Sequence, residues 1–239
     1  MATSTKRDLV RRSYDALRWL EQRVSRSIEV PSGGFPPATL HTSGETDEPM
    51  VALTFDDGPD PDLTPPLLDL LAERGVKATF YVIGQNAQRH PEVVWRAFDE
   101  GHEIGNHTWS HRFLTTQRTR SIVEELERTD EVVAGIIGES PTTLRPPYGA
   151  TTRLLAAWSL HQFGYETVLW SVDSKDYDGV GPEEITSRLA DQSATGSIIL
   201  CHDPMPATLE AMPGALDRLL GRGLRFVSVS SLLERPSGN

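Results

Sequence analysis

The sequence predicts an α/β fold built as an incomplete (β/α) barrel. After residue 50, short apolar runs with strand propensity alternate with longer runs that have helical periodicity. Such alternation implies parallel strands joined by helical crossovers. The chain has 239 residues and 38% hydrophobic content, enough for one sizeable core. Seven strands fit one barrel better than two separate domains. The strand-like runs cover residues 51–55, 78–82, 102–106, 142–145, 167–172, 197–201 and 225–229.

Residues 7–29 are typical of an amphipathic helix, because apolar residues recur there at three- and four-residue steps. Residues 1–30 hold seven basic and four acidic side chains, whereas the whole chain is acidic. We expect this helix to pack on the acidic main domain or to pair with a second copy. Weak contact with a membrane surface is the alternative. The apolar stripe consists of Val10, Tyr14, Leu17, Leu20, Val24 and Ile28.

Residues 31–48 are rich in Pro, Gly, Ser and Thr, which predicts a linker or surface loop. The expected organisation is therefore a helix within residues 1–30, a linker over residues 31–48 and a main domain over residues 49–239. In that domain, Thr64 is the predicted N-cap of the first helix, and Gly75 ends it. Further helices are predicted at residues 91–100, 119–137, 151–163, 182–191 and 207–221.

Composition excludes several classes of protein. The net charge is −11, with 34 acidic and 23 Lys or Arg residues, and a nucleic-acid binder would need a basic surface. No apolar run reaches 18 residues, so no transmembrane segment is predicted. Charged residues interrupt the first thirty positions, which argues against a secretory signal peptide and favours a cytoplasmic or membrane-peripheral location. The single cysteine, Cys201, excludes an internal disulfide framework.

The first predicted strand ends in two adjacent carboxylates, Asp56 and Asp57, followed by Gly58 and Pro59. Taken alone, these four residues fit an ordinary turn, because Asp, Gly and Pro each favour turn geometry. Two neighbouring carboxylates repel each other, however. A metal ion would explain the pair by binding one carboxylate and leaving the other free to act as a base.

Polar side chains also follow the other predicted strands. Barrel enzymes carry their reactive groups in the loops after the carboxyl ends of the strands, so these residues should share one face. Their accumulation there favours a site over an isolated turn. The residues are Asp56, Asp57, His107, His111, Arg145, Tyr148, Asp173, Asp176, Tyr177 and His202.

His107 and His111 are four residues apart, and a helical turn would bring their imidazoles to one side. Two histidines and one carboxylate form a three-ligand set with open coordination positions, which is typical of a catalytic zinc site. Zinc is the expected ion, and cobalt, nickel or ferrous iron are alternatives.

Hydrolysis at such a site also needs a base for the water and an acid for the leaving group. One carboxylate of the Asp pair can be the base, and Arg145 can pair with it and keep it ionised. His202 is the natural acid, because imidazole titrates near neutral pH. Either Asp173 or Asp176 can hold that imidazole. Individually, Arg145 could be a structural ion pair and the two Asp residues solvated loop charges.

These motifs resemble the polysaccharide deacetylase family, also called the NodB-homology domain or carbohydrate esterase family 4. The resemblance extends from about residue 48 to the C-terminus and implies a distorted (β/α)7 barrel. It rests on five blocks in order: Thr54-Phe-Asp-Asp-Gly-Pro59, His107-Thr-Trp-Ser-His111, Arg145-Pro-Pro-Tyr148, Asp173-Ser-Lys-Asp-Tyr177 and Leu200-Cys-His202.

The resemblance implies separate roles for the two carboxylates. Asp56 would be the general base and Arg145 would tune it. Asp57 would bind the metal ion together with His107 and His111.

The resemblance also implies roles on the opposite side of the site. His202 would be the general acid, tuned by Asp176. The backbone N–H of Tyr148 would stabilise the oxyanion, and Leu200 would line the pocket for the acetyl methyl group. The family often has Trp where this chain has Tyr177, which changes the size and hydrogen bonding of one pocket wall.

The implied activity is metal-dependent removal of an N-acetyl group from an amino sugar or oligosaccharide, with release of acetate. One alternative is an esterase that acts on O-acetyl groups of xylan. Two others are a non-catalytic carbohydrate-binding relic and a metal-independent amidohydrolase on the same barrel. The complete ligand and acid–base set argues against the last two.

Overall fold

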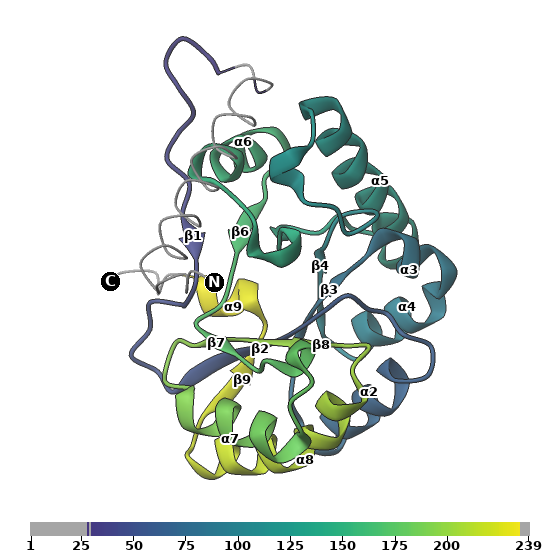
Figure 1. Ribbon diagram of the computed structural model, residues 1–239, viewed down its shortest axis with the longest axis vertical. Coiled ribbons are helices and arrows are strands. Elements are labelled where there is room, and N and C mark those ends of the chain that lie inside the picture. Colours follow the sequence, from purple (N-terminus) through teal and green to yellow (C-terminus); the bar gives the residue numbers. More distant parts are fainter. Residues whose placement is uncertain (1–27, 29, 235–239) are drawn as a thin grey trace, which may run out of the picture.

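The structure is a computed structural model that describes residue 28 and residues 30–234 (Figure 1). Apart from Ile28, the helix predicted over residues 7–29 lies outside the described residues, as do the contacts expected of it. Ile28 itself is buried and packs with Leu155 and Trp158. Within the described part of the chain, no helix is long and apolar enough to cross a membrane.

A curled parallel sheet forms the centre of the molecule, and helices cover its outer side (Figure 1). The strand order is β1-β6-β5-β4-β3-β2-β8-β7, and β9 also pairs with β2. This half-barrel confirms the predicted α/β barrel class. The strands are β1 (Leu40–His41), β2 (Met50–Asp56), β3 (Thr79–Val82), β4 (Glu103–Asn106), β5 (Thr143–Leu144), β6 (Glu166–Val168), β7 (Val172–Asp173), β8 (Ile198–His202) and β9 (Arg225–Val227).

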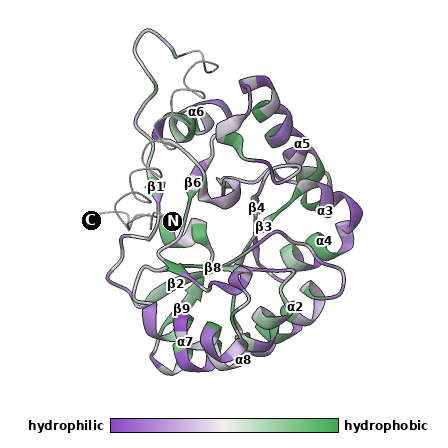
Figure 2. Ribbon diagram, viewed as in Figure 1, coloured by the Kyte–Doolittle hydropathy of each residue, from purple (hydrophilic) through white to green (hydrophobic). Residues whose placement is uncertain are grey.

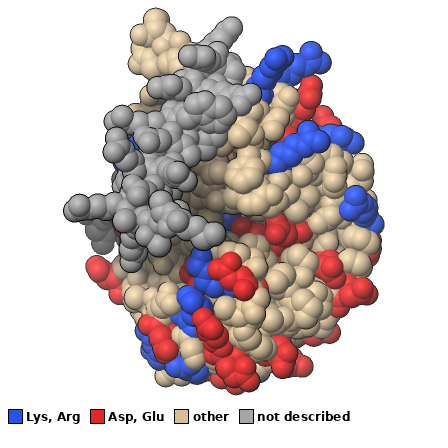
Figure 3. Space-filling model, in the orientation of Figure 1, with Lys and Arg blue, Asp and Glu red and all other residues tan. Residues whose placement is uncertain are grey.

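The helices turn their apolar sides to the sheet and their polar sides to solvent (Figure 2). Acidic and basic side chains are interspersed on the face drawn in Figure 3. The longer helices are α2 (Thr64–Glu73), α4 (Pro91–Asp99), α5 (Thr119–Ile137), α6 (Arg153–Phe163), α7 (Pro182–Gln192) and α8 (Pro206–Gly221). Shorter ones are α3 (Gly84–Arg89), α9 (Val229–Leu233) and the 3-10 turns η1 (Leu114–Thr116), η2 (Pro147–Gly149) and η3 (Asp176–Asp178).

Strand β2 lies in the core between β3 and β8. Its alternate side chains Val51, Leu53 and Phe55 pack into the main hydrophobic cluster with residues of α2, α7 and α8. The side chains between them belong to the other face, which is why the polar residues Thr54 and Asp56 are buried inside the curl. The strand that ends in the Asp pair is thus rigidly held on both faces.

The predicted strand over residues 167–172 is wrong in detail, because the segment forms two strands. Residues 166–168 pair with β5 and β1, whereas residues 172–173 pair with β8. Between them, the N–H of Ser171 donates to the carbonyl of Ile198. One segment therefore spans from one end of the open sheet to the other, and it must change partners on the way.

Three further differences concern local structure. The loop expected over residues 31–48 contributes the edge strand β1, which pairs with β6. Helices α3 and α9 have five or six residues, too few for a clear apolar period. Thr64 is not an N-cap: it is the first residue of α2, and its hydroxyl accepts from the Asp60 N–H and donates to Asp203.

Candidate active site

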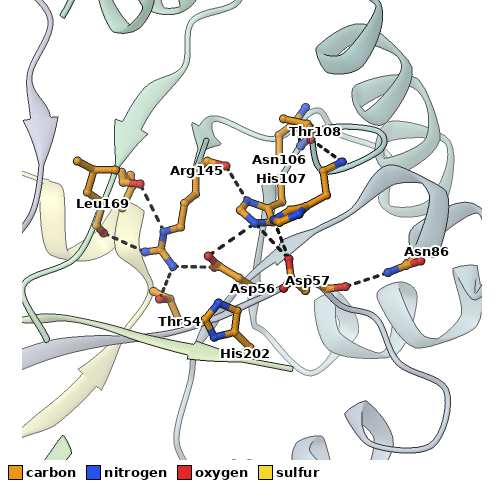
Figure 4. A network of polar contacts seen from close by, with 12 residues as sticks. Thr54, Asp56, Asp57, Asn86, Asn106, His107, Thr108, Arg145, Leu169 and His202 are labelled. Carbon is orange, nitrogen blue, oxygen red and sulfur yellow. Dashed lines mark hydrogen bonds and ion pairs between the residues drawn. The ribbon is translucent and has the colours of Figure 1, made fainter. Parts of the chain in front are cut away.

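The polar residues predicted to share one face lie at the carboxyl ends of β2, β4, β5, β7 and β8. Figure 4 shows the side chains of Arg145, His107 and His202 gathered around Asp56 and Asp57. A pocket of about 340 Å³ opens at this point. It is lined by Asp56, Asp57, His107, His111, Tyr148, Gly149, Trp170, Tyr177, Leu200, His202 and Met205.

Asp57, His107 and His111 form a cluster with metal-ligand chemistry, since their candidate ligand atoms lie within 4.8 Å of one another. The Oδ1 atom of Asp57 is 3.4 Å from Nε2 of His107 and 3.1 Å from Nε2 of His111. Burial alone would raise the pKa of Asp57, but the two imidazoles hold that pKa below its ordinary value.

This cluster fits a divalent cation for two reasons. The Nδ1–H of His107 donates to the carbonyl of Arg145 at 2.6 Å, so its Nε2 can present a lone pair to the cluster. The Oδ1 atom of Asp57 is buried and accepts no hydrogen bond from the residues that the structure describes, although it is flanked by two ring nitrogens. A buried carboxylate oxygen without a donor needs another partner, and a cation would supply it.

The loop over residues 107–111 brings the two imidazoles together, and the helical turn expected from their spacing is wrong. Thr108 and His111 have left-handed backbone, with φ of 69° and 57°. The side-chain oxygen of Asn106 accepts from the Thr108 N–H at 2.7 Å, and the Thr108 hydroxyl accepts from the His111 N–H at 3.1 Å. The four-residue spacing therefore identified the right pair of histidines, but a loop and not a helical turn brings their rings together.

Helix α5 holds this loop from the side. The carboxylate of Glu125 accepts from both the N–H and the hydroxyl of Ser110, at 2.7 and 2.6 Å. The guanidinium of Arg128 lies 3.8 Å from the centre of the Trp109 ring. Trp109 and Ser110, which stand between the paired imidazoles, are therefore both held by α5.

Asp56 is paired with a fully buried arginine. Arg145 has 0% exposure, and its Nη1 donates to Oδ1 of Asp56 at 2.7 Å and to the Thr54 hydroxyl at 2.6 Å. Its Nη2 donates to the carbonyl of Leu169 at 3.0 Å, and its guanidinium stacks over the Tyr81 ring at 4.2 Å. These contacts compensate the buried positive charge, and the Asp56 carboxylate supplies the opposite charge beside it.

His202 is paired with Asp176, which resolves the choice between Asp173 and Asp176. Its Nδ1 lies 2.7 Å from Oδ1 of Asp176, and the Thr208 hydroxyl donates to Oδ2 at 2.6 Å. Burial lowers the pKa of His202, but the hydrogen bond and charge of Asp176 outweigh it and raise the pKa above its ordinary value. Asp173 instead accepts from the Tyr177 hydroxyl at 2.9 Å and from Lys175 at 2.8 Å.

Leu200 and Tyr177 line the pocket, as the resemblance predicted. Tyr148 lines it too, whereas Asp173 bonds to Tyr177 and is not among the lining residues. The Tyr148 ring lies 4.6 Å from the His111 ring. The Tyr177 ring meets His202 edge to face at 5.3 Å.

Left-handed backbone is concentrated at this site. Within the part of the chain that the structure describes, every non-glycine residue with positive φ belongs to one of the site loops. Left-handed geometry costs a non-glycine residue on the order of 1 kcal/mol, so it persists where the surroundings demand it. The residues are Asp57, Thr108, His111, Tyr148 and Lys175.

Sequence reasoning missed several parts of the site. Trp170 and Met205 line the pocket, but they stand outside the recognised blocks. Asp203 is 3% exposed, and its carboxylate touches Gly58 so closely that a Cβ there would lie 1.9 Å from Oδ2. Burial raises the pKa of Asp203 to about 7. Its position directly after His202 was the only signal in the sequence.

A buried carboxylate paired with an arginine, a histidine paired with a carboxylate and a candidate cation cluster meet in one pocket, and these are the groups that a metal-dependent hydrolase needs. Comparison with known proteins narrows the class. Residues 43–168 match the polysaccharide deacetylase family. The chain is 38% identical over 196 residues to a peptidoglycan-N-acetylglucosamine deacetylase of Bacillus cereus, covering 80% of this chain and 71% of that protein.

Two further relatives agree. The peptidoglycan-N-acetylglucosamine deacetylase PgdA of Listeria monocytogenes is 36% identical, over 76% of this chain but only 38% of that longer protein. A crystal structure of a peptidoglycan N-acetylglucosamine deacetylase superposes with a TM-score of 0.79 at 35% identity, covering 84% of this chain and 95% of that one. The chain therefore belongs to the polysaccharide deacetylase family, which confirms the resemblance found in its motifs.

Proposed function

We propose that this protein hydrolyses N-acetyl groups of an amino sugar polymer or oligosaccharide of the peptidoglycan type and releases acetate. The observation that carries the proposal is that the Asp56–Arg145 and His202–Asp176 pairs share one pocket with the Asp57–His107–His111 cluster. We assign the catalytic unit to residues 49–239. The family match and the named activities of the relatives support this assignment.

Asp57, His107 and His111 would hold one divalent metal ion. We propose zinc, because two imidazoles and a carboxylate suit it, with cobalt or nickel as substitutes. When bound, such an ion polarises a carbonyl group and lowers the pKa of water.

The residues of the chain itself would move the protons. The Asp56 carboxylate takes a proton from the attacking water, and the ion pair with Arg145 holds that carboxylate in place. The water oxygen bonds to the acetyl carbon, and the Tyr148 N–H donates to the oxygen on which charge develops. His202 then gives its proton to the nitrogen as the C–N bond breaks, so acetate and a free amine leave.

The paired acid favours an amide substrate over an ester. An amine is a poor leaving group unless it is protonated, whereas an alkoxide leaves more easily. His202 is oriented and kept protonated by Asp176, which supplies what an amide needs. Leu200 and Trp170 give the pocket an apolar wall against which an acetyl methyl group can pack.

Acetate release tests the proposal. Protein loaded with zinc, cobalt or nickel would be assayed on N-acetylglucosamine oligomers, peptidoglycan and O-acetylated xylan. We expect release from the N-acetylated substrates, with His202→Ala and Asp56→Asn each losing most turnover while retaining metal. His161→Ala, an exposed histidine on α6, is the matched control. Full activity in either site variant would overturn the assigned roles, and activity confined to xylan would overturn the amide substrate.

A further inference from the structure

Asn106 is the last residue of β4 and directly precedes the candidate metal ligand His107. Its side chain is fully buried. The amide oxygen accepts from the Thr108 N–H at 2.7 Å, a bond drawn in Figure 4, and the backbone carbonyl accepts from the Arg145 N–H at 3.0 Å. Asn106 therefore links the loop that carries two candidate ligands to the segment that carries the partner of Asp56.

The bond from Thr108 to Asn106 is the first of two that shape this loop. Thr108 has left-handed backbone, with φ of 69°. An Asn side chain that accepts from the N–H two residues later stabilises such a turn. The Thr108 hydroxyl in turn accepts from the His111 N–H at 3.1 Å. The direction of the Asn106 amide therefore affects the whole loop as far as His111.

The nitrogen of the Asn106 amide faces three acceptors. It lies 2.8 Å from the Tyr165 hydroxyl, 3.0 Å from Oδ1 of Asp130 and 3.1 Å from the carbonyl of Leu126. The Tyr165 hydroxyl also donates to Oδ1 of Asp130, so its own oxygen can accept from the amide. The amide nitrogen and the tyrosine hydroxyl therefore share one carboxylate oxygen.

The direction of this amide depends on its partners. An Asn amide keeps nearly the same shape when it makes half a turn, so its hydrogen bonds distinguish the oxygen from the nitrogen. A turned amide would place its oxygen against the Asp130 carboxylate and its NH2 group against the Thr108 N–H. The Tyr165 hydroxyl could adapt by turning its proton, whereas an ionised carboxylate only accepts. Of these two side chains, Asp130 is therefore the one that fixes the direction of the amide.

We propose that Asp130 is a positioning residue for the candidate metal ligands and acts on them through the amide of Asn106. The inference rests on the proposed function, because these ligands form the metal centre of that function. Asp130 lies on α5, 24 residues from Asn106 in the chain, and it belongs to none of the motif blocks. Hydrogen bonds that orient metal ligands from outside typically contribute about tenfold or more to metal affinity.

Zinc affinity, measured by competition with a chromogenic chelator, tests this inference without a substrate. Asp130→Leu removes the acceptor and should weaken zinc binding about tenfold. Asp130→Asn keeps an oxygen that can accept from the Asn106 amide and the Tyr165 hydroxyl, so it should restore most of the affinity. Ile122→Val, a packing change at a buried position of the same helix, is the control and should bind zinc like the wild type.

A double-mutant cycle shows whether Asp130 acts through Asn106. Asn106→Ala should weaken zinc binding at least as much as Asp130→Leu does. In the Asn106→Ala background, Asp130→Leu should cause no further loss, because the amide that connects it to the loop is already absent. A loss that adds to that of Asn106→Ala would mean that Asp130 acts by another route, and the inference would be wrong. Should Asn106→Ala not fold, the comparison of Asp130→Leu with Asp130→Asn carries the test alone.

The same measurements separate this inference from the proposed function. If the wild type binds zinc and Asp130→Leu binds it equally tightly, the role of Asp130 is wrong and the proposed function stands. The same holds if Asp130→Asn binds zinc as weakly as Asp130→Leu. Equal weakening in Ile122→Val would also contradict the role, because loosening of α5 would then be a sufficient cause. If the wild type binds no zinc, the metal centre of the proposed function fails, and this inference fails with it.

Discussion

His202 is held at two points by the one carboxylate of Asp176. The ring Nδ1 lies 2.7 Å from Oδ1, and the backbone N–H donates to Oδ2, also at 2.7 Å. The same side chain thus fixes the strand end and the imidazole that projects from it. Orientation and protonation of the proposed acid are therefore set together.

Asp176→Asn should move the alkaline limb of the kcat–pH profile to lower pH. Asp176 raises the pKa of His202 against the effect of burial, so removing its charge lets that pKa fall. The proposed acid acts only when it is protonated, so the loss of activity with rising pH should begin at a lower pH than in the wild type. The profile is measured under saturating substrate and metal. Thr208→Val, which removes only the hydroxyl bond to Oδ2, is the control and should shift the limb less.

Arg145→Met should destabilise the protein by about 3–5 kcal/mol, because it leaves Asp56 buried without its partner. Urea unfolding gives the free energy of unfolding. Adding Asp56→Asn should recover part of the loss, since an amide needs no compensating charge. If the double variant is no more stable than Arg145→Met, the ion pair is not the cause.

Glu125→Gln should weaken metal binding about tenfold, although Glu125 touches no candidate ligand. Its carboxylate accepts two hydrogen bonds from Ser110 and so holds the loop between His107 and His111. Competition with a chromogenic chelator measures the zinc affinity. Glu131→Gln, an exposed carboxylate on the same helix, is the matched control. Equal affinities in the two variants would show that the loop keeps its shape without α5.

Asp203→Asn should flatten the pH dependence of stability. Burial raises the pKa of Asp203 from 3.8 to about 7 in the folded protein. Folding thus favours the protonated carboxyl. Its contribution to the free energy of unfolding is complete below the pKa of the unfolded state and is lost as pH rises through the pKa of the folded state. The wild type should lose on the order of 4 kcal/mol more than Asp203→Asn between acidic pH and pH 8. Urea unfolding measures the free energy of unfolding at each pH. If this free energy changes equally with pH in the two proteins, the assignment is wrong.

Gly58→Ala should destabilise the protein, because its Cβ would lie 1.9 Å from Oδ2 of Asp203. Gly135→Ala supplies the comparison: this glycine lies within α5 and a Cβ there meets nothing within 4 Å. In a helix interior that change should stabilise by up to about 1 kcal/mol. Thermal unfolding of the two variants should therefore shift in opposite directions. A Gly58→Ala protein as stable as the wild type would show that Asp203 can move away.

The sequence predicted the features that depend on pattern and chain order. The apolar run before Asp56 is a buried central strand, and the carboxyl ends of parallel strands meet at one edge. For this reason the sequence alone assigns residues as distant as Asp57, His111 and His202 to one site.

Features that depend on tertiary partners could not be predicted in this way. Residues 167–172 have the strand propensity of one continuous strand, and the partners β5 at one end and β8 at the other divide the segment into two strands. The loop between His107 and His111 needs Glu125, which is fourteen residues beyond His111 on another element. Pattern and chain order alone leave Asp173 and Asp176 equal as partners of His202; the family resemblance points to Asp176, and the folded loop brings Asp176 to the imidazole.

The left-handed residues of the site loops lead to an expectation about relatives that have lost catalytic activity. Glycine at any one of them would relieve backbone strain, since glycine adopts positive φ freely. Together these positions carry on the order of 5 kcal/mol of strain, comparable with the net stability of a small domain. A lineage released from selection for catalysis should therefore accumulate glycines at Asp57, Thr108, His111, Tyr148 and Lys175, and descendants that kept the barrel but lost the chemistry should carry that signature.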